Sequence, residues 1–150
     1  MKRHKNGFTL IEILVVLGLI AILASVVLIA VNPARQFAQG RNAQRESSVN
    51  TLLNALGQNL ADNKGVFTCA GMGTTPSAIA THIGVGSGNV NLACLVPTYI
   101  PSAIPMDPTN GTADDTQYTI AVDTTGRYII CAPGHAEVAI SGSVPFCITR

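Results

Sequence analysis

The sequence predicts an α+β fold, in which a long N-terminal membrane-spanning helix packs against a small antiparallel sheet of three to four strands. Residues 13–31 form an uninterrupted, uncharged apolar run. Apolar residues then recur at helical spacing up to Leu60, and short alternating segments separated by turns fill the chain from Gln117 onward. A helical period followed by a two-residue period indicates one long helix and one sheet.

The apolar run is long enough to cross a membrane. Together with Phe8–Ile11, residues 13–31 reach the ~20 residues that a helix needs to span the hydrocarbon core. Three basic residues lie directly before the span: Lys2, Arg3 and Lys5. The arginines beyond it are more widely spaced: Arg35, Arg41 and Arg45. This asymmetry predicts a cytoplasmic N-terminus and an exported remainder.

The start of the span does not fit a general secretory signal, because no convincing Ala-x-Ala cleavage site follows the apolar core. The block Gly7-Phe8-Thr9-Leu10-Ile11-Glu12 instead resembles the processing site of type IV pilins and type II secretion pseudopilins. The resemblance implies that a prepilin peptidase cuts after Gly7 and N-methylates the new first residue, Phe8. Methylation would keep that amine cationic.

Glu12 is the carboxylate at the head of this apolar run. Burying an ionised Glu toward the bilayer centre costs about 2.5–3.5 kcal/mol, so such a residue calls for a partner. Phe8 and Glu12 are four residues apart and lie on one helix face. The resemblance implies that Glu12 receives the Phe8 amine of a neighbouring subunit during assembly. The alternative is a side chain that only extends to interfacial water; the complete leader motif favours the assembly role.

The resemblance also implies how the chain is divided and where it resides. The expected parts are a leader peptide 1–7, a transmembrane and assembly half of the helix 8–31, an amphipathic half 32–63, and a globular head 64–150 with a loop region 64–116 and a sheet 117–150. The protein would be a single-pass inner-membrane protein with its head outside, and later a subunit of an extracellular or periplasmic filament. Its implied partners are the prepilin peptidase, identical and related pilin subunits, the inner-membrane assembly platform and, before assembly, membrane lipid.

Beyond the span, Asn32-Pro33 either kinks the helix or caps a second helical segment with Pro33 at its first position. In both cases helix resumes and runs to about Asn63. An apolar stripe follows on this segment: Val49, Leu52, Leu53, Leu56 and Leu60. Its polar flank, which includes Arg45, predicts no site. Gly65 is a candidate left-handed cap.

The loop region is rich in glycine, and its sequence context does not fit a phosphate-binding loop. A short helix is expected over 77–83, with Ile79 and Ile83 facing inward. The later turn Pro105-Met106-Asp107-Pro108 is similar to a turn that leads into the sheet of pseudopilin heads. The sheet itself is expected to begin with a hairpin of strands 117–122 and 127–132, followed by strands at 136–140 and 144–149.

Four cysteines lie in the exported half, where disulfides form: Cys69, Cys94, Cys131 and Cys147. Sequence order and the predicted strands favour Cys69 with Cys94 and Cys131 with Cys147. Zinc ligation is the competing interpretation, but the sequence has no Cys-x-x-Cys spacing. Free thiols are the remaining alternative.

No cofactor is expected. The acidic loop from Asp107 to Asp123 is where a calcium ion would bind in some major pseudopilins, but its spacing matches no ligand set and favours a solvated loop. Removing Lys2, Arg3 and Lys5 leaves six basic against eight acidic residues, a net side-chain charge of −2, which argues against direct nucleic-acid binding.

The sequence favours a structural filament subunit over an enzyme. Neither Gly-x-Ser-x-Gly nor His-Glu-x-x-His occurs, and His82 and His135 are isolated. The predicted function is a prepilin-like subunit of a type IV pilus or a type II secretion pseudopilus. The alternatives are a single-span anchored ligand-binding domain outside the cytoplasm, and a DNA-uptake pilin.

Overall fold

The computed structural model describes residues 7–150 and divides the chain into two compact units. One unit ends at Gln36, and the other, called the C-terminal unit below, runs from Phe37 to Arg150. Most of the predicted leader, with its basic residues Lys2, Arg3 and Lys5, lies outside the described residues. The α+β class and the antiparallel sheet predicted from the sequence are confirmed.

The apolar run forms helix α1, Leu10–Val31. Within it, Leu10–Leu28 is long and apolar enough to cross a membrane. The helix ends at Asn32, whose φ of +40° is left-handed, a conformation that asparagine tolerates better than most residues.

Helix α2 covers Pro33–Asp62 and restarts directly after this break. The Oδ1 atom of Asn32 accepts a hydrogen bond from the backbone N–H of Arg35 at 3.3 Å, and Pro33 occupies the first helical position. Of the two alternatives at Asn32-Pro33, the capped second segment is therefore correct. Beyond the helix, Gly65 has a φ of +86°, and its N–H donates to Leu60 O at 2.7 Å, as expected for a helix-ending glycine.

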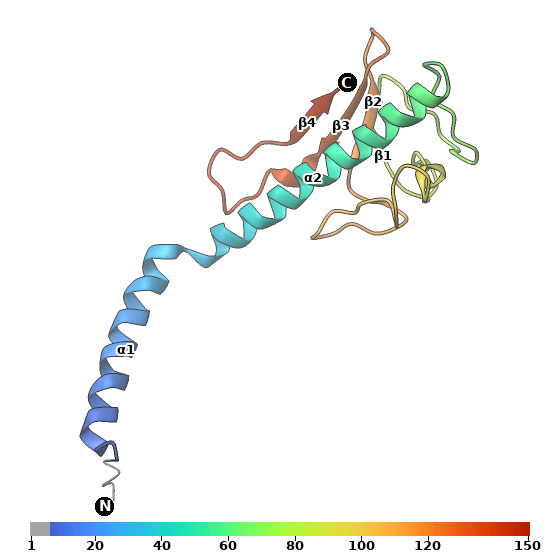
Figure 1. The fold of residues 1–150 in the computed structure, drawn as a ribbon. Helices are drawn as coiled ribbons and strands as arrows, with labels where there is room; N and C mark the ends of the chain where they lie inside the picture. Colours follow the sequence, from blue (N-terminus) through green and yellow to red (C-terminus); the bar gives the residue numbers. More distant parts are fainter. Residues whose placement is uncertain (1–6) are drawn as a thin grey trace, which may run out of the picture. The chain divides into compact units, whose positions relative to one another are not determined.

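The sheet has four antiparallel strands in the order β1-β2-β3-β4. Their bounds are β1 Thr81–His82, β2 Thr119–Val122, β3 Tyr128–Ala132 and β4 Phe146–Thr149. The predicted hairpin is present as β2 and β3, with Ile120 paired to Ile130. Figure 1 shows the strands alongside α2, with the long loop (green to orange) leading into β2.

Two predicted elements are wrong. Residues 77–83 form no helix. They contain strand β1 instead, because this segment pairs with residues remote in sequence, as in the bond from Ile83 N to Tyr118 O at 2.9 Å. Ile79 is 78% exposed rather than inward-facing. Residues 136–140 form no strand. A short 3-10 helix at Pro133–His135 and local backbone bonds hold that segment as a turn, which leaves Val138 fully exposed.

The core of the C-terminal unit lies between α2 and the sheet and is completed by the loop region. Helix α2 supplies four residues of the predicted stripe and Ala55, whereas Leu60 is only partly buried: Val49, Leu52, Leu53, Ala55 and Leu56. The strands and loops supply Ile83, Val90, Leu92, Leu95, Ile100, Tyr118, Ile120, Ile130 and Ala132. Burial of each large aliphatic or aromatic side chain contributes about 1.5–3 kcal/mol before conformational entropy is subtracted.

Candidate functional site

The residues of the predicted processing and assembly site lie at the exposed N-terminus of α1. Gly7 precedes the helix, and Phe8 is 86% exposed. Thr9 is the N-cap, and its Oγ1 accepts from Glu12 N at 3.3 Å. The Glu12 carboxylate reaches back to Thr9, whose backbone N–H donates to Glu12 Oε2 at 2.7 Å.

These contacts form a capping box, which satisfies two of the four free N–H groups at a helix start. The Thr9 hydroxyl also donates to Glu12 Oε2 at 2.8 Å. Glu12 thus has a partner within its own chain, which was not predicted from the sequence. The Thr-x-x-Glu spacing before an apolar run is the signal that identifies this arrangement.

The side surface of α1 is apolar on all sides and uncovered. The candidate span Leu10–Leu28 has none of its residues buried by the described protein. A helix that is hydrophobic all round requires lipid or other protein around it, because this much apolar surface is strongly disfavoured in water. The helix is therefore suited to a membrane or to a bundle of similar helices.

The C-terminal unit contains a buried charged cluster around Arg45, called the Arg45 cluster and composed of Arg41, Arg45, Asp107 and Glu137. Arg45 lies on α2 and is 2% exposed. It donates from Nε to Asp107 Oδ2 at 2.6 Å, from Nη2 to Asp107 Oδ1 at 3.1 Å and from Nη1 to Glu137 Oε1 at 2.6 Å. Two further bonds go to Asn42 and Thr109, so that all five guanidinium N–H groups have a partner.

Arg41 extends the cluster to the protein surface. Its Nε and Nη2 donate to the two Glu137 carboxylate oxygens at 2.7 and 2.8 Å. Hydrogen bonds from Arg41 and then from Arg45 lower the pKa of Glu137 to about 2, from its ordinary 4.5. For Asp107, burial alone would raise the pKa, but the hydrogen bonds from Arg45 and from backbone N–H groups outweigh burial and lower it. Both carboxylates are therefore ionised at neutral pH.

The Arg45 cluster joins three segments that are remote in sequence: α2, the turn at Asp107 and the turn at Glu137. Position 134, which packs against the cluster, has no room for a side chain, because a Cβ atom at Gly134 would lie 2.8 Å from Asp107 Oδ2. Because every N–H donor of the Arg45 guanidinium is bonded within the protein, the cluster has the features of a structural element that holds these three segments together. The sequence predicted no site on the polar flank of α2, and it did not predict that Arg45 on this flank is buried.

The acidic residues of the loop from Asp107 to Asp123 lie apart, and the expected solvation of this loop is wrong for Asp107, which is buried. Asp107 is buried against Arg45, Asp115 Oδ1 lies 2.8 Å from His82 Nδ1, and Asp123 caps its own turn through Thr125 and Arg127. Within residues 7–150, no three His, Cys, Asp or Glu side chains are grouped so that they could hold a metal ion.

Two disulfides join the cysteines in the pairs expected from the sequence. Cys69 is bonded to Cys94, across 25 residues of the loop region. Cys131 on β3 is bonded to Cys147 on β4, across 16 residues, and these two residues are also directly opposed in the strand register.

The comparison with protein families gives a match at the start of the chain. A family model described as the prokaryotic N-terminal methylation motif matches residues 2–28. The match covers Gly7, Phe8 and Glu12 together with the apolar run up to Leu28, and it is the prepilin-like signature that the start of the sequence resembles. No curated protein and no solved structure matches the chain.

Proposed function

We propose, from the prepilin-like signature in residues 2–28, that this chain is the precursor of a structural filament subunit of the type IV pilus or pseudopilus kind. A prepilin peptidase would cut after Gly7 and methylate Phe8. The processed subunit would then leave the lipid and enter a filament through α1. The exported C-terminal unit would decorate the filament and carry out no catalysis.

The observation that carries this proposal is the match over residues 2–28, at the helix start that the structure describes. Phe8 is exposed and Thr9 begins the helix, so the bond after Gly7 lies in non-helical chain that a peptidase can engage. The uncovered apolar surface of α1 supports the exchange of lipid for neighbouring helices, since both environments are equally apolar.

Glu12 is proposed to change partner during assembly. In the described chain its carboxylate is bound to Thr9. The methylated Phe8 amine of a neighbouring subunit would offer a cationic donor, which adds an attraction between opposite charges that the neutral donors of Thr9 do not supply. The capping box would thus keep Glu12 satisfied until the amine of another subunit arrives.

Intact-mass measurement of the membrane-extracted full chain tests the processing step. The chain should lack Met1–Gly7 and carry the mass of one added methyl group on Phe8. The variant Gly7→Leu should retain the leader, because a bulky side chain at the cleavage position obstructs the peptidase. A wild-type chain that retains Met1–Gly7 in cells with an active prepilin peptidase would refute the proposal and favour a simple membrane anchor.

The assembly role is tested separately with Glu12→Gln, which removes the charge and keeps the shape. We expect insertion and processing close to wild type and a loss of the subunit from sheared filaments. Glu46→Gln is the matched control, because Glu46 is an exposed glutamate on α2, and filaments should form normally from it. Normal filaments from Glu12→Gln would rule out the pairing with Phe8.

A further inference from the structure

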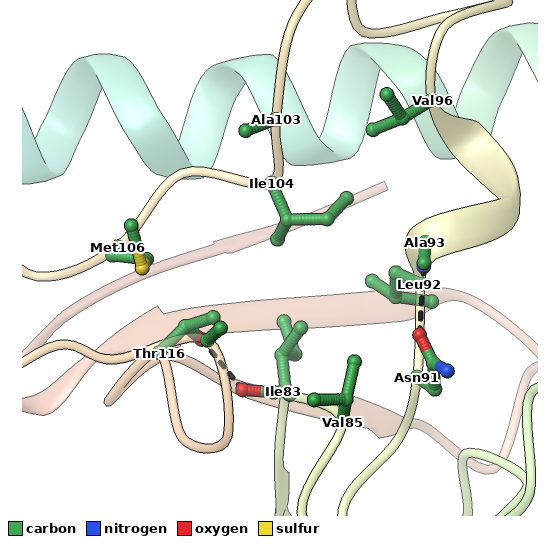
Figure 2. Close-up of a pocket in the computed structure, with 12 residues that line it drawn as sticks. Ile83, Val85, Asn91, Leu92, Ala93, Val96, Ala103, Ile104, Met106 and Thr116 are labelled. Carbon is green, nitrogen blue, oxygen red and sulfur yellow. Dashed lines mark hydrogen bonds between the residues drawn. The ribbon is translucent and has the colours of Figure 1, made fainter.

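The loop region of the C-terminal unit lines a cavity of about 350 Å³, open to solvent on one side, that neither the fold nor the proposed function requires. Four loop segments line it, and Figure 2 shows their side chains around the opening. The apolar side chains that define its shape are Ile83, Val85, Leu92, Val96, Ile104 and Met106. Ile83 and Leu92 are fully buried, so the floor of the cavity is the protein core itself.

The two polar side chains of the wall, Thr116 and Asn91, each bond to the backbone through their oxygen atom. Thr116 Oγ1 donates to Ile83 O at 2.7 Å and accepts from Tyr118 N at 3.3 Å. Asn91 Oδ1 accepts from Ala93 N at 2.9 Å, as the dashed line in Figure 2 shows. No charged side chain lines the cavity. A guest is therefore selected by shape and apolar contact, and a net charge would be left without a counter-ion.

The walls are fixed by covalent and steric constraints. Cys94, beside Ala93, is tied by its disulfide to Cys69. Gly84, which also lines the cavity, contacts the backbone of Asp114 so closely that a Cβ atom would overlap it. A cavity held open in this way is preformed, as small-molecule sites usually are.

The mouth is too small for a protein interface. Of the exposed large apolar side chains in the described part of the C-terminal unit, only Val85 and Met106 border it, at 55% and 43% exposure. A stable protein interface needs about 800 Å² on each partner. These two side chains instead form a narrow apolar rim around an opening for a small molecule.

We propose that this cavity binds a small uncharged apolar molecule, such as a bicyclic aromatic compound. An apolar cavity of about 150 Å³ holds benzene, and about 350 Å³ leaves room for a larger ring system. Any polar group of the guest would point out past Met106 into solvent. This inference rests on the C-terminal unit alone and is independent of the proposed filament role.

The experiment is methyl NMR of the full chain in lipid nanodiscs, with labelled methionine and isoleucine and with indole as the probe. Indole should produce saturable shifts of the Met106, Ile83 and Ile104 methyl signals. Met72 lies against the core but does not line the cavity, so its signal should stay in place as an internal control.

Two variants place a phenyl ring at the exposed wall of the cavity, Ala103→Phe and Ala113→Phe. At least one should retain the wild-type Met72 signal and thermal midpoint and lose the response to indole by tenfold or more. Ala61→Phe adds the same ring at an exposed position of α2 and should respond like wild type. The proposal is overturned if indole leaves Met106 and Ile104 unshifted, or if a folded blocking variant responds as strongly as wild type.

Discussion

Replacing Arg45 by methionine should lower the free energy of unfolding of the C-terminal unit by about 3–5 kcal/mol, the usual cost of breaking a buried ion pair from one side. The structure indicates that the loss of unfolding free energy lies in the upper part of this range. It removes five hydrogen bonds at once and leaves Asp107, whose side chain is 4% exposed, without its counter-ion. For a unit of this size, the loss corresponds to a fall in melting temperature of about 10–20 °C.

The assay is thermal and urea unfolding of the full chain in detergent micelles with the disulfides intact. The chain has no Trp and three Tyr, so near-UV circular dichroism of tyrosine reports on the C-terminal unit. The matched control is Arg127→Met. Arg127 is 62% exposed in its pair with Asp123, and a surface pair of this kind contributes at most about 1 kcal/mol.

The double variant Arg45→Met, Asp107→Asn separates charge pairing from general damage. With the carboxylate already neutral, removing Arg45 should cost about 2 kcal/mol less than it does in the wild-type background, because no buried ion is left unpaired. The reasoning fails if Arg45→Met unfolds within about 1 kcal/mol of Arg127→Met, or if the two substitutions are simply additive.

Three further outcomes follow from the site. The pKa of Glu137 in the folded protein, about 2, lies below its ordinary 4.5, so its ion pairs contribute full stability above about pH 4.5 and lose it as the pH falls toward 2. The melting temperature should therefore fall less steeply over this pH range for Glu137→Gln than for wild type. An equal fall in both proteins would contradict the ion pairing of Glu137. Thr9→Ala should cost the start of α1 about 1 kcal/mol, seen as faster amide exchange in its first turn with an unchanged melting temperature of the C-terminal unit; unchanged exchange would mean that the capping box does not hold. Replacing Cys131 and Cys147 together by serine should cost about 3 kcal/mol by releasing a 16-residue loop, measured by urea unfolding, and a variant as stable as wild type would show that the bond does not constrain the chain.

The elements that could be predicted from the sequence are those whose formation depends on residues close together in the chain. The apolar run predicted α1, and the turn at 123–126 predicted the hairpin of β2 and β3. Asn32-Pro33 indicated either a kink or the start of a second helical segment, and the second of these is found. Each of these depends on residues within a few positions of one another. The match to residues 2–28 is likewise local, as is the Thr9–Glu12 spacing that was overlooked.

The features that the sequence did not reveal depend on residues far apart. Arg45 meets Asp107 and Glu137 across 62 and 92 residues, so the helical period alone could not distinguish it from a solvated arginine. Strand β1 has two residues and exists only through its pairing with β2. The apolar residues at 136–140 alternate as a strand would, but local backbone bonds hold them in a turn.

The bond between Cys131 and Cys147 also determines what the edge of the sheet can do. Strand β4 lies at one edge of the sheet, so its outer backbone groups offer a place for another chain to pair. Proteins that assemble at high local concentration are prone to exchange such edge strands between copies. Because β4 is bonded to its neighbour at directly opposed positions, it cannot leave its own sheet while the bond is oxidised. Strand exchange between copies through β4 is therefore limited to chains in which this disulfide has not yet formed.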